Sequence, residues 1–225
     1  MAKIKWGLFV TDGRGKVGGH VLSKNLGGAF IRTKVTPTNP QTTYQTAVRA
    51  LFGQISQSWS GLSDSVRAGW QEAVASWQKT DIFGDLKSPS GKALFQRLNN
   101  QAQSAGYPAV TAVPAKLDMV SGIVTGVDLI TPSDIIPLTG AYAGADARVV
   151  LSATAQLSAG TRSVGNKLRQ IYSEVANAYD PAAAYTAYTD KFGVPTAGAN
   201  VYFSVKYVLP NGQASPAQII KGFVQ

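Results

Sequence analysis

The glycines of residues 11–20, TDGRGKVGGH, have the spacing of a loop that could hold a phosphate. Gly13, Gly15 and Gly18 form the pattern G-x-G-x-x-G. In a dinucleotide-binding fold this pattern follows a strand, begins a helix and precedes an acidic residue about 20 positions later. Here the residues after Gly18 are typical of a strand, and residues 33–38 contain no acid. A phosphate loop is also excluded, because Val17 stands where the motif needs serine or threonine. We therefore expect the glycines to form tight hairpin turns.

Other residues that could do chemistry are few. The chain has one histidine, His20, and no cysteine, which excludes thiolate metal sites and sites that need two imidazoles from one chain. Asp81 and Asp85 form a close pair in TDIFGD, and this spacing favours a turn stabilised by aspartate side chains over a magnesium site. No G-x-S-x-G or H-E-x-x-H motif is present. We expect no enzyme activity, no metal and no cofactor.

Positive charge is concentrated at the N-terminus. Residues 1–49 hold eight Lys or Arg residues and one acid, Asp12, which gives +7 of the total net charge of +9. A basic end on a nearly neutral body favours a segment that meets an anionic partner, either an acidic protein surface or nucleic acid. The alternative is an exposed hairpin whose lysines are simply solvated. The candidate partner-binding residues are Arg14, Lys16, Lys24, Arg32 and Lys34.

The order of patterns along the chain predicts three parts. Strands are expected over residues 4–10, 17–23 and 29–35, with glycine-rich turns at 11–16 and 25–28. Helical spacing follows, with a first helix that begins at Asn39-Pro40 and carries an apolar stripe, a second that begins at Ser63-Asp64, and a third that begins at Ser88-Pro89. The stripe of the first helix consists of Tyr44, Val48, Leu51, Phe52, Ile55 and Trp59.

From residue 109 the apolar pattern has a period of two, which predicts strands. The expected strands are 109–113, 122–130, 148–156, 168–176, 200–209 and 216–224, with a turn at Pro210-Asn211-Gly212 before the last one. The fold class is therefore α+β. A basic glycine-rich β-hairpin arm (1–38) precedes a three-helix unit (39–108) and an antiparallel immunoglobulin-like β-sandwich (109–225). The sequence contains no run of about 18 apolar residues, so we expect no membrane span.

Several of these segments together resemble a group of small virion-associated proteins of tailed bacteriophages and prophages, including the crAss-like group. The resemblance covers roughly residues 13–100. Its features are the glycine–lysine hairpin at Gly15 to Gly18, the strand at Arg32 to Lys34 before Asn39 to Gln41, the tryptophan-bearing helix pair from Trp59 to Trp70, and the segment from Ser90 to Phe95. It implies a structural role in the virion.

The end of the chain resembles a second kind of module. Residues Tyr202 to Tyr207, followed by Asn211 to Pro216, are similar to the last hairpin of a fibronectin type III or immunoglobulin-like domain. No tryptophan follows Trp77, whereas such domains usually carry one early in the fold.

These observations lead to a non-enzymatic virion protein as the expected function. The favoured role is an auxiliary capsid protein, a cement or decoration protein that docks in many copies on the major capsid protein through its basic N-terminal half. The alternatives are a portal-ring, head-fibre or tail component, and, from a different class, a nucleic-acid-binding protein. We expect localisation to the virion, after assembly in the host cytoplasm, and no membrane partner.

Overall fold

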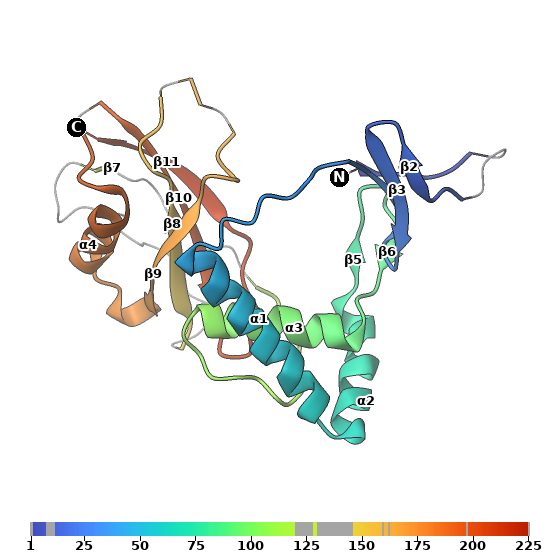
Figure 1. Ribbon diagram of the computed structural model, residues 1–225. Helices are drawn as coiled ribbons and strands as arrows, with labels where there is room; N and C mark the ends of the chain where they lie inside the picture. The colour runs from blue at the N-terminus through green and yellow to red at the C-terminus, as the bar shows by residue number, and fades with distance from the viewer. Residues whose placement is uncertain are drawn as a thin grey trace.

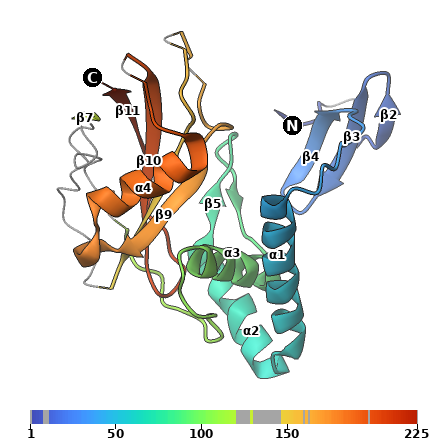
Figure 2. The ribbon, with the colours of Figure 1, turned by 60° about the vertical axis from the view of Figure 1, so that its left-hand side comes forward.

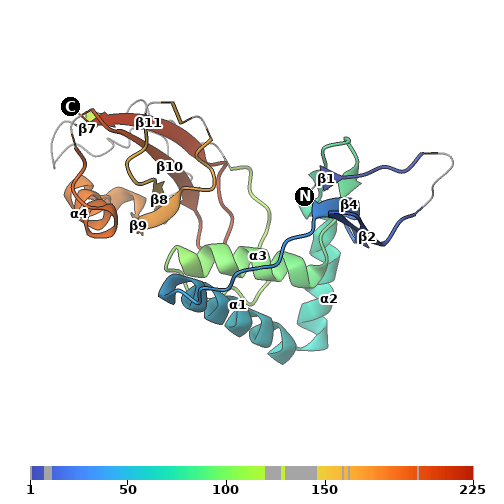
Figure 3. The same cartoon turned by 45° about the horizontal axis from the view of Figure 1, so that its top comes forward.

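The computed structural model describes residues 2–7, 12–119, 128–129, 146–158, 160–161, 163–196 and 198–224. It contains helices and antiparallel sheets, which confirms the mixed α+β class. A small N-terminal sheet and a larger C-terminal sheet lie at opposite ends, and the helices α1, α2 and α3 lie between them (Figure 1). Figure 3 shows the same order from another direction.

The N-terminal sheet has four strands in the order β1-β4-β3-β2, all antiparallel. They are β1 (Ala2–Lys3), β2 (Gly15–Val17), β3 (His20–Asn25) and β4 (Gly28–Thr33). The predicted turn at residues 25–28 is confirmed between β3 and β4. The predicted strand 17–23 is wrong at its start, because a turn at residues 18 and 19 separates β2 from β3. Gly18 has φ +55°, which glycine adopts readily in a two-residue hairpin turn.

The remaining N-terminal predictions have mixed outcomes. Residues 4–7 form no strand, and residues 8–10 of the predicted strand 4–10 lie outside the described residues. Gly18 precedes strand β3 and no helix, so the glycine pattern lacks the helix N-terminus of a phosphate loop. The expectation that these glycines serve a hairpin is thus confirmed at β2 and β3.

The helical unit consists of α1 (Thr43–Gly61), α2 (Asp64–Ala73), the 3₁₀ helix η1 (Val74–Trp77) and α3 (Gly91–Ser104). The start of α2 after Ser63 is as predicted. The predicted starts of the other two helices are wrong by a few residues. Thr42 caps α1 by accepting a hydrogen bond from the Gln45 N–H at 3.3 Å, and Ser90 caps α3. Before Thr42, Gln41 has φ +49°, which interrupts the helix expected from Asn39.

The core of this unit is aromatic, as the sequence predicted. Trp70 is completely buried, and its ring meets Phe95 edge-on with centroids 5.3 Å apart. The Trp59 ring also contacts the Phe95 ring, and Trp77 belongs to the same buried cluster. The predicted stripe of α1 is only partly used, since Ile55 is buried whereas Tyr44, Val48 and Phe52 are exposed.

The C-terminal sheet has the strand order β7-β11-β10-β8-β9. Its strands are β7 (Asp128–Leu129), β8 (Arg148–Ala153), β9 (Arg169–Val175), β10 (Asn200–Val208) and β11 (Gln218–Val224). Pairing is antiparallel except between β7 and β11. The last four strands confirm predicted strands to within a few residues. The predicted strand 122–130 lies outside the described residues, except for β7.

A helix that was not predicted from the sequence covers one face of this sheet. The helix α4 (Pro181–Phe192) begins after Asp180, which caps it, and lies across the sheet (Figure 2). Its residues Ala184 and Tyr188 pack in one cluster with Phe203 and Val205 of β10. The described strands of the C-terminal half therefore form a single sheet, and α4 covers one of its faces.

The predicted strand 109–113 is not formed, because its backbone binds side chains of the helical unit. The Asn99 side-chain amide donates to the Val110 carbonyl at 2.9 Å and accepts from the Val110 N–H at 2.8 Å. The indole of Trp70 donates to the Thr111 carbonyl at 3.0 Å. These bonds hold the segment against the helices, away from the sheet.

A short hairpin extends from the helical unit to the N-terminal sheet. It consists of β5 (Lys79–Thr80) and β6 (Leu86–Lys87), joined by residues 81–85. Figure 1 shows this hairpin beside the N-terminal strands.

Candidate functional site

The structure places all five predicted partner-binding residues on the surface of the N-terminal sheet or its loops. Arg14 precedes β2, Lys16 lies in β2, Lys24 in β3 and Arg32 in β4, and Lys34 follows β4. They do not form a single cluster, because the strand register puts Lys24 on the face opposite that of Lys16 and Arg32.

Register brings Lys16 and Arg32 to the same face. Val21 of β3 lies opposite Lys16 on one side and opposite Arg32 on the other. Residues directly opposite one another share a face, so Lys16 and Arg32 lie on the same face with β3 between them. Their backbones are about 10 Å apart, which is twice the spacing of neighbouring strands. The Lys34 N–H donates to the Gly19 carbonyl at 2.8 Å, which continues the β4 alignment and puts Lys34 on this face too. We call Lys16, Arg32 and Lys34 the basic face.

The other two cations have an acidic neighbour. The Asp12 carboxylate lies 3.8 Å from Arg14 Nε and 3.8 Å from Lys24 Nζ. No ion pair of the basic face is found with any residue that the structure describes. Uncompensated charge is therefore concentrated on Lys16, Arg32 and Lys34, and they are the best placed of the five to meet an acidic surface.

The sheet that carries these residues has almost no core of its own. Among the described residues up to position 54, none is fully buried, and Ile55 is the first that is. Trp6, Leu22, Phe30 and Ile31 are only partly covered, and Val17 is 60% exposed. A small sheet needs an apolar face packed on something to be stable. This sheet has surface left to bury.

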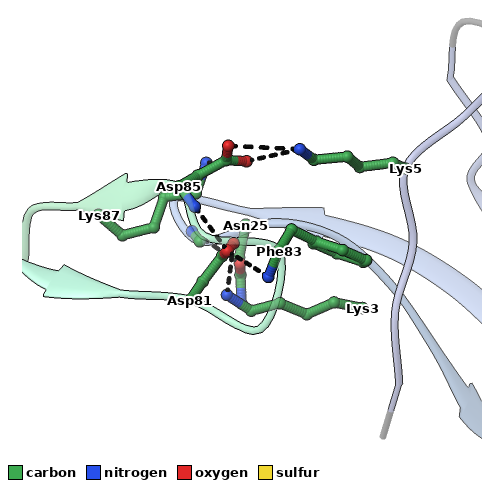
Figure 4. A network of polar contacts seen from close by, with 8 residues as sticks. Lys3, Lys5, Asn25, Asp81, Phe83, Asp85 and Lys87 are labelled. Atoms are coloured by element: carbon green, nitrogen blue, oxygen red, sulfur yellow. Dashed lines mark hydrogen bonds and ion pairs between the residues drawn. The ribbon is translucent and has the colours of Figure 1, made fainter.

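Two ion pairs attach the N-terminal sheet to the β5–β6 hairpin. Lys3 Nζ lies 3.2 Å from an Asp81 oxygen, and Lys5 Nζ lies 3.0 Å from an Asp85 oxygen. The Lys5 ammonium also lies over the Phe83 ring at 5.2 Å. Figure 4 shows both lysines reaching the carboxylates from the neighbouring chain segment. No pattern in the sequence indicated this long-range contact.

The role predicted for Asp81 is confirmed. Its other oxygen accepts from the Phe83 N–H at 2.8 Å and the Asp85 N–H at 3.2 Å, as in a turn stabilised by an aspartate. Burial raises the pKa of the Asp81 carboxyl, but the Phe83 N–H, Lys3 and the Asp85 N–H together outweigh burial and lower that pKa below its usual value. Asp81 is therefore ionised when it holds Lys3.

One edge of the N-terminal sheet is free to pair. β2 is the last strand in the order, and no further strand lies beside it among the described residues. Such an edge presents backbone N–H and C=O groups that can accept a strand from another chain. Lys16 lies in the middle of this edge strand.

The described residues provide little else for chemistry. His20 is exposed at the start of β3, opposite Val17 and Thr33. Within the described ranges no three His, Cys, Asp or Glu side chains are grouped closely enough to hold a metal ion. No described helix is long and apolar enough to cross a membrane.

A scan against protein-family models and searches of curated proteins and of solved structures found no match to this chain.

Proposed function

We propose that this chain is a non-enzymatic structural protein of a tailed-bacteriophage particle, an auxiliary capsid protein that docks on the major capsid protein through its N-terminal sheet. The observation that carries the proposal is that this sheet has no fully buried residue among those described, yet carries an unpaired basic face. Docking would bury its partly covered apolar side chains and pair its cations.

The free edge of β2 supports a specific mode of docking. A strand of the partner would add beside β2 through backbone hydrogen bonds, and Lys16, Arg32 and Lys34 would face acidic side chains. Each contact is weak, but a capsid lattice repeats the same site many times, so avidity would hold a protein that spans neighbouring sites.

In this proposal the C-terminal half would be an immunoglobulin- or fibronectin III-like module that faces outward from the capsid. The order β11-β10-β8-β9 is that of the G-F-C-C′ strands of a variable-type immunoglobulin sheet, which supports this assignment. In this chain α4 would occupy the face that otherwise packs on the second sheet.

The electrostatic part is tested by the double variant Lys16→Glu with Arg32→Glu. Its particle occupancy should fall well below that of the wild type, while its melting temperature stays within a few degrees, because both side chains are exposed. The matched control is Lys167→Glu with Lys221→Glu, which makes the same charge change at two exposed sites of the C-terminal half. Equal occupancy of the two variants would refute docking through the basic face.

Copy number separates the alternatives. Quantitative mass spectrometry of purified particles, scaled to the major capsid protein, should give hundreds of copies for a lattice-wide auxiliary protein. About a dozen copies would assign the chain to a portal ring, head fibre or tail. Absence from particles would leave nucleic-acid binding, for which affinity should fall with salt at a log–log slope of roughly −0.9 per neutralised phosphate.

A further inference from the structure

A cleft of about 350 Å³ lies where the helical unit meets the C-terminal sheet. Its walls come from four segments: the end of η1 with the start of β5, one side of α3, the segment 116–119, and the turn before β11. Its lining includes Trp77, Lys79, Arg97, Lys116, Leu117 and Asp118.

Long-range hydrogen bonds fix the shape of this cleft. The buried Gln213 side chain accepts from the Leu117 N–H at 2.9 Å and donates to the Leu117 carbonyl at 2.8 Å. Beside it, Gly212 lies directly against the Leu98 carbonyl of α3. These bonds hold the segment 116–119 in a fixed position as one wall of the cleft, although the segment has no regular secondary structure.

The charge in the cleft is unbalanced. Among the residues that the structure describes, three cations, Lys79, Arg97 and Lys116, line it together with one carboxylate, Asp118. Arg97 is partly buried and its guanidinium lies over the Trp77 ring at 5.3 Å. The guanidinium makes no ion pair, and no hydrogen bond is found for it, with any residue that the structure describes. Burial lowers the pKa of Arg97, which reflects the cost of removing its charge from water.

A partly buried guanidinium without an anion is unfavourable, and an anion that enters the cleft would relieve that cost. Arginine binds carboxylates in a bidentate manner, and Trp77 holds the guanidinium plane in place for such a contact. We propose that this cleft binds an acidic peptide segment of a partner protein, with a carboxylate of that segment on Arg97 and with Lys79 and Lys116 beside it.

The apolar part of the cleft indicates why the ligand is a peptide rather than a free small anion. Leu117 is 51% exposed and stands next to the cations, so the cleft offers apolar surface beside positive charge. An extended segment with an acidic residue next to an aliphatic one would use both. The volume is at the low end of that of ligand sites, enough for one or two side chains. This inference does not depend on the virion role, because it concerns the isolated chain.

The test is an NMR titration of the purified full chain with the peptide acetyl-Leu-Glu-Leu-Glu-amide at constant ionic strength. We expect saturable shifts of the Trp77 indole resonance, assigned with Trp77→Phe. The matched peptide with Gln in place of Glu should bind to the wild-type chain at least about tenfold more weakly. The Glu peptide should bind to the Arg97→Gln variant at least about tenfold more weakly than to the wild-type chain. Arg49→Gln removes an exposed arginine of α1 and should leave binding unchanged.

Two further measurements keep the outcome decisive. If Arg97→Gln loses the dispersed spectrum of a folded chain, Lys116→Gln on the exposed segment replaces it and should weaken binding about threefold. Succinate that binds as tightly as the peptide would overturn the peptide assignment. The absence of saturable shifts, or equal binding by the wild type and the cleft variants, would overturn the site itself.

Discussion

Replacing Gly212 with alanine should destabilise the junction between the helical unit and the C-terminal sheet. Gly212 has φ +79°, and a left-handed backbone costs a non-glycine residue about 1–2 kcal/mol. The new Cβ would also lie 2.2 Å from the Leu98 carbonyl oxygen and 2.7 Å from its carbon. These are backbone atoms of α3, so the clash can be relieved only by moving the helix or the turn. Overpacking of this kind costs about 1–3 kcal/mol.

The two contributions together lower the free energy of unfolding by about 3 kcal/mol, which corresponds to a fall in melting temperature of roughly 6–12 °C for a chain of this size. Thermal unfolding followed by circular dichroism measures it. Gly198→Ala is the matched control, since Gly198 has φ +82° but no atom within 4 Å of the added Cβ. It should lose only about 1 kcal/mol, or roughly 2–4 °C. If both variants melt at the same temperature, the close approach of Gly212 to α3 does not contribute to stability, and the reasoning fails.

Three other predictions follow from single side chains. Trp70→Phe removes the donor to the Thr111 carbonyl from a fully buried site and should lower the free energy of unfolding by about 2 kcal/mol in urea denaturation. Tyr188→Phe should leave stability at pH 8 unchanged or higher, because no partner for the buried hydroxyl is found among the described residues. Burial, together with Tyr185, raises the pKa of Tyr188 to about 12. The wild type should therefore lose stability as pH rises from about 10, where the unfolded tyrosine ionises, towards 12, and the phenylalanine variant should lose less in melting curves at both pH values. Asp81 has a lowered pKa, so its contribution is present above about pH 4 and is lost as pH falls through the folded value. Hydrogen-exchange protection of residues 81–87 should fall at pH 2.5 relative to pH 5, and unchanged protection would contradict the role of the carboxylate.

Local patterns predicted the helices of the central unit well, because their apolar spacing and their caps lie within a few residues of one another. The errors at helix starts have local causes that the sequence contains. Thr42 and Gln45 have the spacing of a capping box, and Ser90 is as good a cap as Ser88. The missed helix α4 also had a start signal in Asp180 and Pro181, but its alanine-rich sequence has no clear apolar stripe.

What the sequence did not predict depends on contacts between distant residues. The segment 109–113 has the alternating pattern of a strand, yet the Asn99 amide satisfies the Val110 backbone as a neighbouring strand would. Likewise, nothing near Lys3 indicates that it contacts Asp81, and the position of Lys24 on the face opposite that of Lys16 and Arg32 follows from the strand register alone. Only the charge excess of the N-terminal part, and hence the choice of candidate residues, could be seen in advance.

The two sheets differ in how completely they are buried, and this difference bears on how the molecule would work. In β10 the side chains of Val201, Phe203, Val205 and Tyr207 are buried beneath α4, so the C-terminal sheet contains a core within the single chain. The N-terminal sheet is connected to the rest by ion pairs of exposed or partly exposed lysines, and contacts of this kind contribute little to stability. It is therefore the part whose stability has most to gain from a partner. A partner surface that buried Val21 or Phe30, which share the face of Lys16 and Arg32, and neutralised these two cations would stabilise the sheet as it binds, so that docking and stabilisation of the N-terminal part would be coupled.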